Sequence, residues 1–85
     1  MLEIIKERLS ECNPEALFID GFDNALIGIA RRCGSPDVAV YDYAKCVDVM
    51  VDRDGMSHDE AVEYMEYNVA GAYVGENGPI LVDLE

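Results

Sequence analysis

The 85-residue sequence has little positive charge, with six lysines and arginines against eighteen aspartates and glutamates and a formal net charge of −12. Affinity for nucleic-acid phosphates depends on lysine and arginine, so we predict no direct binding to nucleic acid. The acids instead suit a protein partner with a basic surface. They are concentrated late in the chain: residues 1–41 hold seven acids and four bases, whereas residues 42–85 hold eleven and two.

Long hydrophobic runs and paired cysteines are missing as well. No apolar segment approaches the roughly 20 residues of a membrane span, and the start of the chain lacks the apolar stretch of a signal peptide. We therefore expect a cytoplasmic protein that does not bind membranes. The three cysteines, Cys12, Cys33 and Cys46, include no CxxC pair, which argues against a disulfide framework or a zinc site. Apolar or turn-like residues flank each cysteine, so we expect the three side chains to be buried as small hydrophobic groups.

The residues of common catalytic and metal sites are scarce. The only histidine, His58, falls in the first turn of a predicted helix, where we expect it to be solvated, and a zinc or iron site needs several such ligands. A calcium loop aligned on Gly55 would place Met50 and Ala61 at key ligand positions. The sequence has no nucleophile elbow and no phosphate-binding glycine loop. We predict that the chain is not an enzyme and carries no metal or cofactor.

The length allows one domain, residues 1–85. Apolar residues at helical spacing predict a short amphipathic helix over residues 1–12, which must dock to be stable and which Asn13–Pro14 ends. Residues 16–20 and 25–32 are apolar runs separated by turn residues, and they predict a hairpin. A helix over residues 23–32 is the alternative. A loop over residues 33–37 and a strand at residues 38–41 follow.

Two helices are predicted in the second half of the chain. The first begins after Asp42, which can cap it, and ends at Gly55. The second is opened by a capping box, Ser57 and Glu60, and its apolar stripe is Val62, Met65, Val69 and Ala72. A last strand is expected at residues 79–82. The order predicts an α+β fold in which a small antiparallel sheet of about four strands is packed by a two-helix hairpin, with a short N-terminal helix.

The helix predicted after Ser57 carries an acidic face opposite its apolar stripe. The candidate partner-binding residues are Asp59, Glu60, Glu63, Tyr64, Glu66 and Tyr67. The four carboxylates fall within about 10 Å of helix rise, over which one DNA strand presents roughly three phosphates and a duplex about six. Such a face can imitate nucleic acid or simply keep the protein soluble. The tyrosines suit an interface or the rim of a small core equally well.

Three short motifs occur along the chain. Residues 20–28 read DGFDNALIG, residues 38–41 read VAVY and residues 68–76 read NVAGAYVGE. Combined, they resemble a group of short acidic proteins widespread in tailed-phage and prophage genomes. The resemblance covers a core of about residues 14–83 and leaves the N-terminal helix, residues 1–13, outside it. It implies a phage or prophage source and the cytoplasm of an infected host, but no activity and no site residues.

Small phage accessory proteins act on host machinery, so this context favours an inhibitor. We predict that the chain binds and inhibits a host protein, one that handles nucleic acid or defends against phage, through the acidic face. One alternative is a small-ligand-binding protein with a pocket at the loop tips, and another is an oligomeric interaction module that hides a sheet edge. The candidate pocket residues are Asp20, Phe22, Asp23, Asp42, Asn68 and Glu76.

Overall fold

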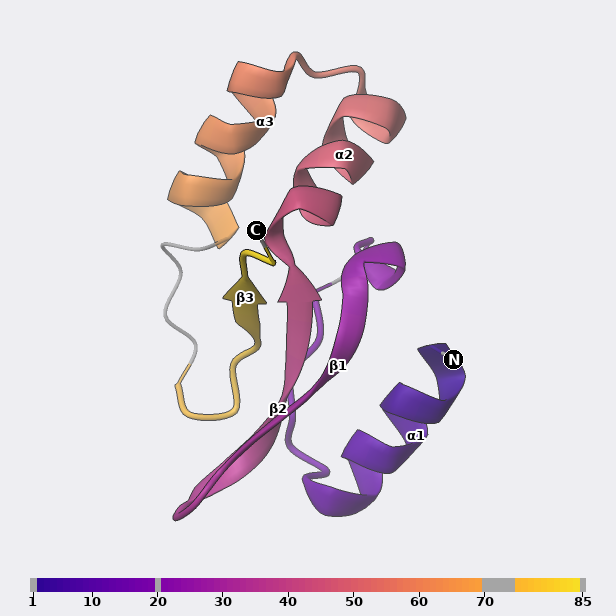
Figure 1. The fold of residues 1–85 in the computed structure, drawn as a ribbon, viewed down its shortest axis with the longest axis vertical. Coiled ribbons are helices and arrows are strands. Elements are labelled where there is room, and N and C mark those ends of the chain that lie inside the picture. The colour runs from indigo at the N-terminus through magenta and orange to yellow at the C-terminus, as the bar shows by residue number, and fades with distance from the viewer. Residues whose placement is uncertain (1, 20, 70–74, 85) are drawn as a thin grey trace.

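The computed structural model describes residues 2–19, 21–69 and 75–84, except for the side chains of Leu2, Arg32, Asn68 and Val69. In chain order its elements are α1 (Leu2–Cys12), the 3-10 turn η1 (Asp23–Ala25), β1 (Leu26–Arg32), β2 (Ser35–Asp42), α2 (Tyr43–Asp54), α3 (His58–Tyr64), the π-helical turn η2 (Met65–Val69) and β3 (Ile80–Val82). The fold is α+β, as predicted. Helix α1 lies beside the β1–β2 hairpin, and α2 and α3 lie beyond the carboxyl end of β2 (Figure 1).

The hairpin is formed by different segments from those predicted. Strand β1 confirms a strand rather than a helix over most of residues 25–32, but it pairs antiparallel with β2 and not with residues 16–19, and Asp20 lies outside the described residues. The Leu17 amide donates a hydrogen bond to the Asn77 carbonyl, and the Ile19 amide donates one to the Tyr41 hydroxyl. These two amides therefore do not pair with a neighbouring strand. The predicted loop at residues 33–37 is shortened to a turn at Cys33–Gly34, where Gly34 has a φ of 82°. The strand register is irregular between Ala30 and Arg32, which accommodates Pro36, a residue without an amide proton.

The sheet is mixed, which corrects the predicted antiparallel sheet. Its order is β1-β2-β3, and β3 runs parallel to β2 with Tyr41 opposite Leu81. Two parallel neighbours need a long crossover, and here the chain between them contains α2, α3 and η2. The described residues hold three strands instead of about four.

Both helices of the second half begin where their capping residues predict, and α2 also ends where predicted. The Asp42 carboxylate accepts hydrogen bonds from the amides of Ala44 and Lys45, and Gly55 ends α2 in the left-handed conformation with a φ of 69°. The capping box at the start of α3 is complete. The regular α-helix ends at Tyr64, where the π-helical turn η2 takes over, and the predicted stripe position Ala72 lies outside the described residues.

One hydrophobic core joins α1, the hairpin and the helices. Its buried members are Leu9, Phe22, Ala25, Leu26, Ala39, Tyr41, Cys46, Val47, Met50, Ala61 and Met65. Helix α1 docks through Leu9, which is fully buried, and this contact stabilises a helix too short to persist alone. Of the three cysteines expected to be buried, only Cys46 is. Cys12 and Cys33 are exposed, because they fall at the end of α1 and at the hairpin turn.

Candidate functional site

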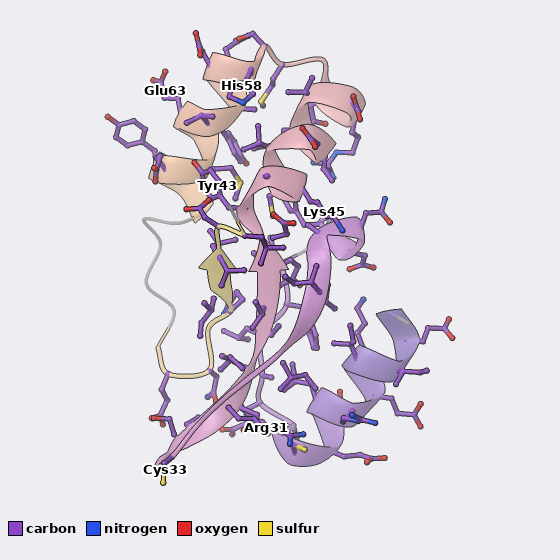
Figure 2. The ribbon with its side chains drawn as sticks, in the orientation of Figure 1. Arg31, Cys33, Tyr43, Lys45, His58 and Glu63 are labelled. Carbon is purple, nitrogen blue, oxygen red and sulfur yellow. The ribbon has the colours of Figure 1, made fainter. Side chains whose placement is uncertain are left out.

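The acidic surface is formed by α3 and η2. All six predicted partner-binding residues are exposed: Asp59, Glu60, Glu63, Tyr64, Glu66 and Tyr67. Beneath them, Ala61 and Met65 are fully buried and anchor the two turns in the core. Figure 2 shows Glu63 projecting from the outer side of α3. The apolar and acidic residues therefore lie on opposite sides of this segment, as their spacing predicts.

The first turn of α3 is held by Ser57 and Glu60. The Glu60 amide donates to the Ser57 hydroxyl oxygen over 3.2 Å, and the Ser57 amide donates to Glu60 Oε1 over 3.1 Å. The bond from the Ser57 amide to the Glu60 carboxylate, assisted by the Ser57 hydroxyl, favours the charged form and lowers the pKa of Glu60. Glu60 is thus both part of the acidic surface and a fixed capping group. His58, in the same turn, is exposed as expected.

A shallow hollow of about 350 Å³ opens on the acidic surface. It is lined by Met56, Glu60, Glu63, Tyr64 and Tyr67. The two rings are 42% and 77% exposed, Tyr67 being the more exposed. Exposed aromatic rings beside carboxylates can hold the stem and the charged head of an arginine or lysine. The chemistry available here is therefore recognition of basic side chains.

Met56 belongs to this hollow although sequence reasoning placed it in a connecting segment. It directly precedes Ser57, the N-cap of α3, and it is half-buried against the core. An apolar residue at this position is typical of a hydrophobic staple. The apolar residue directly before the N-cap is therefore the sequence signal that could have identified Met56.

Tyr43, the first residue of α2, is close enough to Glu66 of the acidic surface to feel its charge. Its hydroxyl is buried and has no hydrogen-bond partner among the described residues. Burial raises the pKa of Tyr43, and the negative charges of Glu66 and Asp83 raise it further. The phenol therefore stays neutral beside these carboxylates and is not a candidate base.

The described residues of the predicted ligand pocket have separate structural roles. Phe22 is buried in the core, the Asp42 carboxylate caps α2, and Asp23 forms an ion pair of 3.1 Å with Lys6. Glu76 is exposed in the turn before β3. Asp20 and the side chain of Asn68 lie outside the described residues.

A different hollow, of about 480 Å³, lies beside the Gly21 turn. It is lined by Gly21, Asn24, Lys45, Asp48, Val49, Asp52 and Arg53. Arg53 closes one side, because its Nη1 donates to the Gly21 carbonyl over 2.7 Å and its guanidinium lies 5.3 Å from the Phe22 ring centroid. Both contacts tie the end of α2 to the turn before η1. Sequence reasoning treated Arg53 only as part of the helix end.

Among residues 2–19, 21–69 and 75–84, no group of three or more histidine, cysteine or acidic side chains is arranged to hold a metal ion. No helix in the same part of the chain is long and apolar enough to cross a membrane. Comparison with protein-family models, with curated proteins and with solved structures found no match.

Proposed function

We propose that this chain is a non-enzymatic, phage-encoded accessory protein that binds and inhibits a basic host protein in the cytoplasm. The target is one that handles nucleic acid or defends against phage. The observation that carries the proposal is the acidic surface on α3 and η2, where four carboxylates and two tyrosines are exposed on one helical segment. Because the backbone of this segment is already helical, binding requires no further ordering of the chain, which lowers its entropic cost.

The charges of this surface are available to a partner. No salt bridge joins Asp59, Glu60, Glu63 or Glu66 to another residue of the described part of the chain. The net charge of −12 adds a long-range field that attracts a basic protein and speeds association. Inhibition follows when the surface occupies the groove through which the host protein would contact phosphates.

The backbone beneath Glu66 and Tyr67 gives further support. Turns of π-helix are rare and occur frequently at functional sites, and η2 carries these two members of the acidic surface. The tyrosines supply the amphipathic anchors that protein interfaces favour. The resemblance to short phage proteins favours the same class of function.

Affinity capture from host lysate tests the proposal with a charge-neutral variant. The variant combines Asp59→Asn, Glu60→Gln, Glu63→Gln and Glu66→Gln. A matched control removes four charges from exposed positions of α1 and α2: Glu3→Gln, Glu7→Gln, Glu11→Gln and Asp48→Asn. We expect the wild type and the control to capture the same basic host protein and the charge-neutral variant to lose most of it.

A second arm measures inhibition directly. The captured protein is purified, and its binding to a single-stranded oligonucleotide is titrated with each form of this chain at low and high salt. The wild type and the control should displace the oligonucleotide in a salt-dependent manner, whereas the charge-neutral variant should not. Equal displacement by all three forms would sink the proposal, as would capture of targets that neither bind nucleic acid nor act in defence against phage.

A further inference from the structure

A second surface of different character lies between α1 and β1. It is a groove of about 590 Å³ lined by Ile4, Ile5 and Arg8 of α1 and by Gly28, Ile29 and Arg31 of β1. Ile4 is 59% exposed, although it is a large hydrophobic residue. At Gly28 a β-carbon would meet no atom within 4 Å, so the absence of a side chain leaves the β1 wall of the groove open.

The groove is basic on a chain that is otherwise acidic. Two of the six lysines and arginines, Arg8 and Arg31, line it. Arg31 Nε lies 3.4 Å from Asp37 Oδ2, and its side chain remains 64% exposed. No salt bridge joins Arg8 to a residue within the described ranges. An isoleucine floor edged by guanidinium groups fits a surface that combines apolar rings with carboxylates.

The acidic surface of this same chain has that composition. Its hollow presents Tyr64, Tyr67 and Met56 together with Glu60 and Glu63. Carboxylates accept the planar fork of arginine, and guanidinium groups stack on tyrosine rings. The two surfaces are thus complementary in charge and in exposed apolar groups.

The complementary surfaces lie toward opposite ends of the molecule, whose longest dimension is 38 Å. Figure 2 shows Glu63 on α3 near one end and Arg31 beside α1 toward the other. A single chain therefore cannot close this contact on itself. We propose that the α1–β1 groove binds the acidic surface of a second copy of this chain, head to tail.

The contact is heterologous, since it joins two different surfaces. Each dimer then keeps one free groove and one free acidic surface, so further copies add, into an open chain or into a closed ring of several copies where the rotation between copies closes. A net charge of −12 on every copy opposes this growth at low ionic strength. The Debye length falls from about 30 Å at 0.01 M salt to about 8 Å at 0.15 M, so association should strengthen over that range.

Complementation between two disabled variants tests the proposal. In the groove variant, Gly28→Val fills the open space and Arg8→Glu reverses a charge. In the acidic-surface variant, Glu63→Lys reverses a charge and Tyr67→Ser removes the more exposed ring. Charge-matched controls are Lys45→Glu and Glu76→Lys, which lie outside both surfaces. Circular dichroism and thermal unfolding verify that each variant is folded.

Sedimentation equilibrium at 0.15 M salt measures the mass of the assembly. Protein concentrations up to about 1 mM make association visible even when its dissociation constant is in the millimolar range. We expect the mass of the wild type and of both controls to rise with concentration past that of a dimer. Each variant alone should remain a 9.4 kDa monomer. Their mixture should form a heterodimer of twice that mass and stop there, because only one complementary pair of surfaces remains.

A wild type that stays monomeric over this range overturns the proposal. So does a closed dimer that grows no further, or a mixture of the two variants that stays monomeric. The groove variant leaves the acidic surface intact and cannot cover that of another copy, so its capture of the host protein should at least equal that of the wild type whether or not the chain self-associates. Failure of this inference is therefore distinguishable from failure of the proposed function.

Discussion

The Tyr41 hydroxyl accepts a hydrogen bond from the Ile19 amide over 2.9 Å. Tyr41 is fully buried in β2, whereas Ile19 belongs to the segment between α1 and η1 that joins no sheet. The bond therefore satisfies an amide that would have found its partner in a strand ladder had residues 16–20 been a strand. It fixes the connecting segment against the core.

Removing this hydroxyl should destabilise the fold. In Tyr41→Phe the ring is kept and the Ile19 amide loses its acceptor, so the free energy of unfolding should fall by about 1–3 kcal/mol. Urea unfolding followed by circular dichroism measures the change. The control, Tyr64→Phe at an exposed position, should stay within about 0.5 kcal/mol of the wild type. Equal stability of the two variants would contradict this role of Tyr41.

Asn13 joins three parts of the fold through its side chain. Its Nδ2 donates to the Asp37 carbonyl and to Asn77 Oδ1, both over 2.9 Å, and its Oδ1 accepts from the Glu15 amide over 3.2 Å. Asn13→Ala leaves these groups without their partner and should cost about 1–3 kcal/mol, since the residue is buried. Asn24→Ala, at an exposed position, is the control for urea unfolding. A loss no larger than that of the control would show that water replaces the Asn13 amide at no cost.

The capping box predicts both a stability change and a pH dependence. Ser57→Ala should lower the free energy of unfolding by about 1 kcal/mol, and Ser10→Ala, at an exposed position of α1, should have a smaller effect. Because the pKa of Glu60 is lowered in the folded state, its contribution is present above the ordinary glutamate pKa near 4.3. That contribution is lost as the pH falls through the lower folded value.

NMR titration of the Glu60 carboxyl group, combined with unfolding at several pH values, checks the second part. The Ser57→Ala variant removes the hydroxyl but keeps the backbone amide, so the Glu60 pKa should rise only part of the way toward its ordinary value. An unchanged Glu60 pKa in this variant would mean that the Ser57 hydroxyl does not contribute to the lowering.

Burial of Cys46 predicts that it is unreactive. Desolvation, assisted by the charge of Asp42, raises the pKa of Cys46 to about 11, whereas Cys12 and Cys33 are exposed. A disulfide reagent at pH 8 should therefore label two thiols rapidly and the third only after unfolding, because the thiolate is the reactive form. The double variant Cys12→Ser, Cys33→Ser should show no rapid labelling, and rapid labelling of it would contradict the buried position.

The same shift makes stability depend on alkaline pH. An unfolded chain releases the Cys46 proton near its ordinary pKa of 9.0, and the folded chain retains it until about pH 11. The stabilising contribution is thus complete below pH 9 and is lost as the pH rises through this window. Cys46→Ala removes this component of the pH dependence, so comparing the two unfolding curves isolates it.

Local features of the sequence determined the helices. The α2 cap at Asp42, its end at Gly55 and the capping box at Ser57 depend on bonds within a few residues, so the sequence alone specifies them. The exposed acidic surface followed from helical spacing for the same reason. The strand at residues 25–32 was also recognisable, because its β-favouring apolar run is continuous.

Only the tertiary structure decided which strands pair and what the loops do. The Ile19 amide meets the Tyr41 hydroxyl only in the folded chain, so residues 16–19 have the local pattern of a strand without forming one. The parallel direction of β3 depends on the crossover that contains α2, α3 and η2, which returns the chain so that Ile80–Val82 pairs with residues 40–42 of β2. The α1–β1 groove joins residues of α1 and β1 that are at least twenty positions apart, and no local pattern could reveal it. Neighbouring residues determine local hydrogen bonding, whereas strand pairing and surface complementarity depend on contacts that only the folded chain makes.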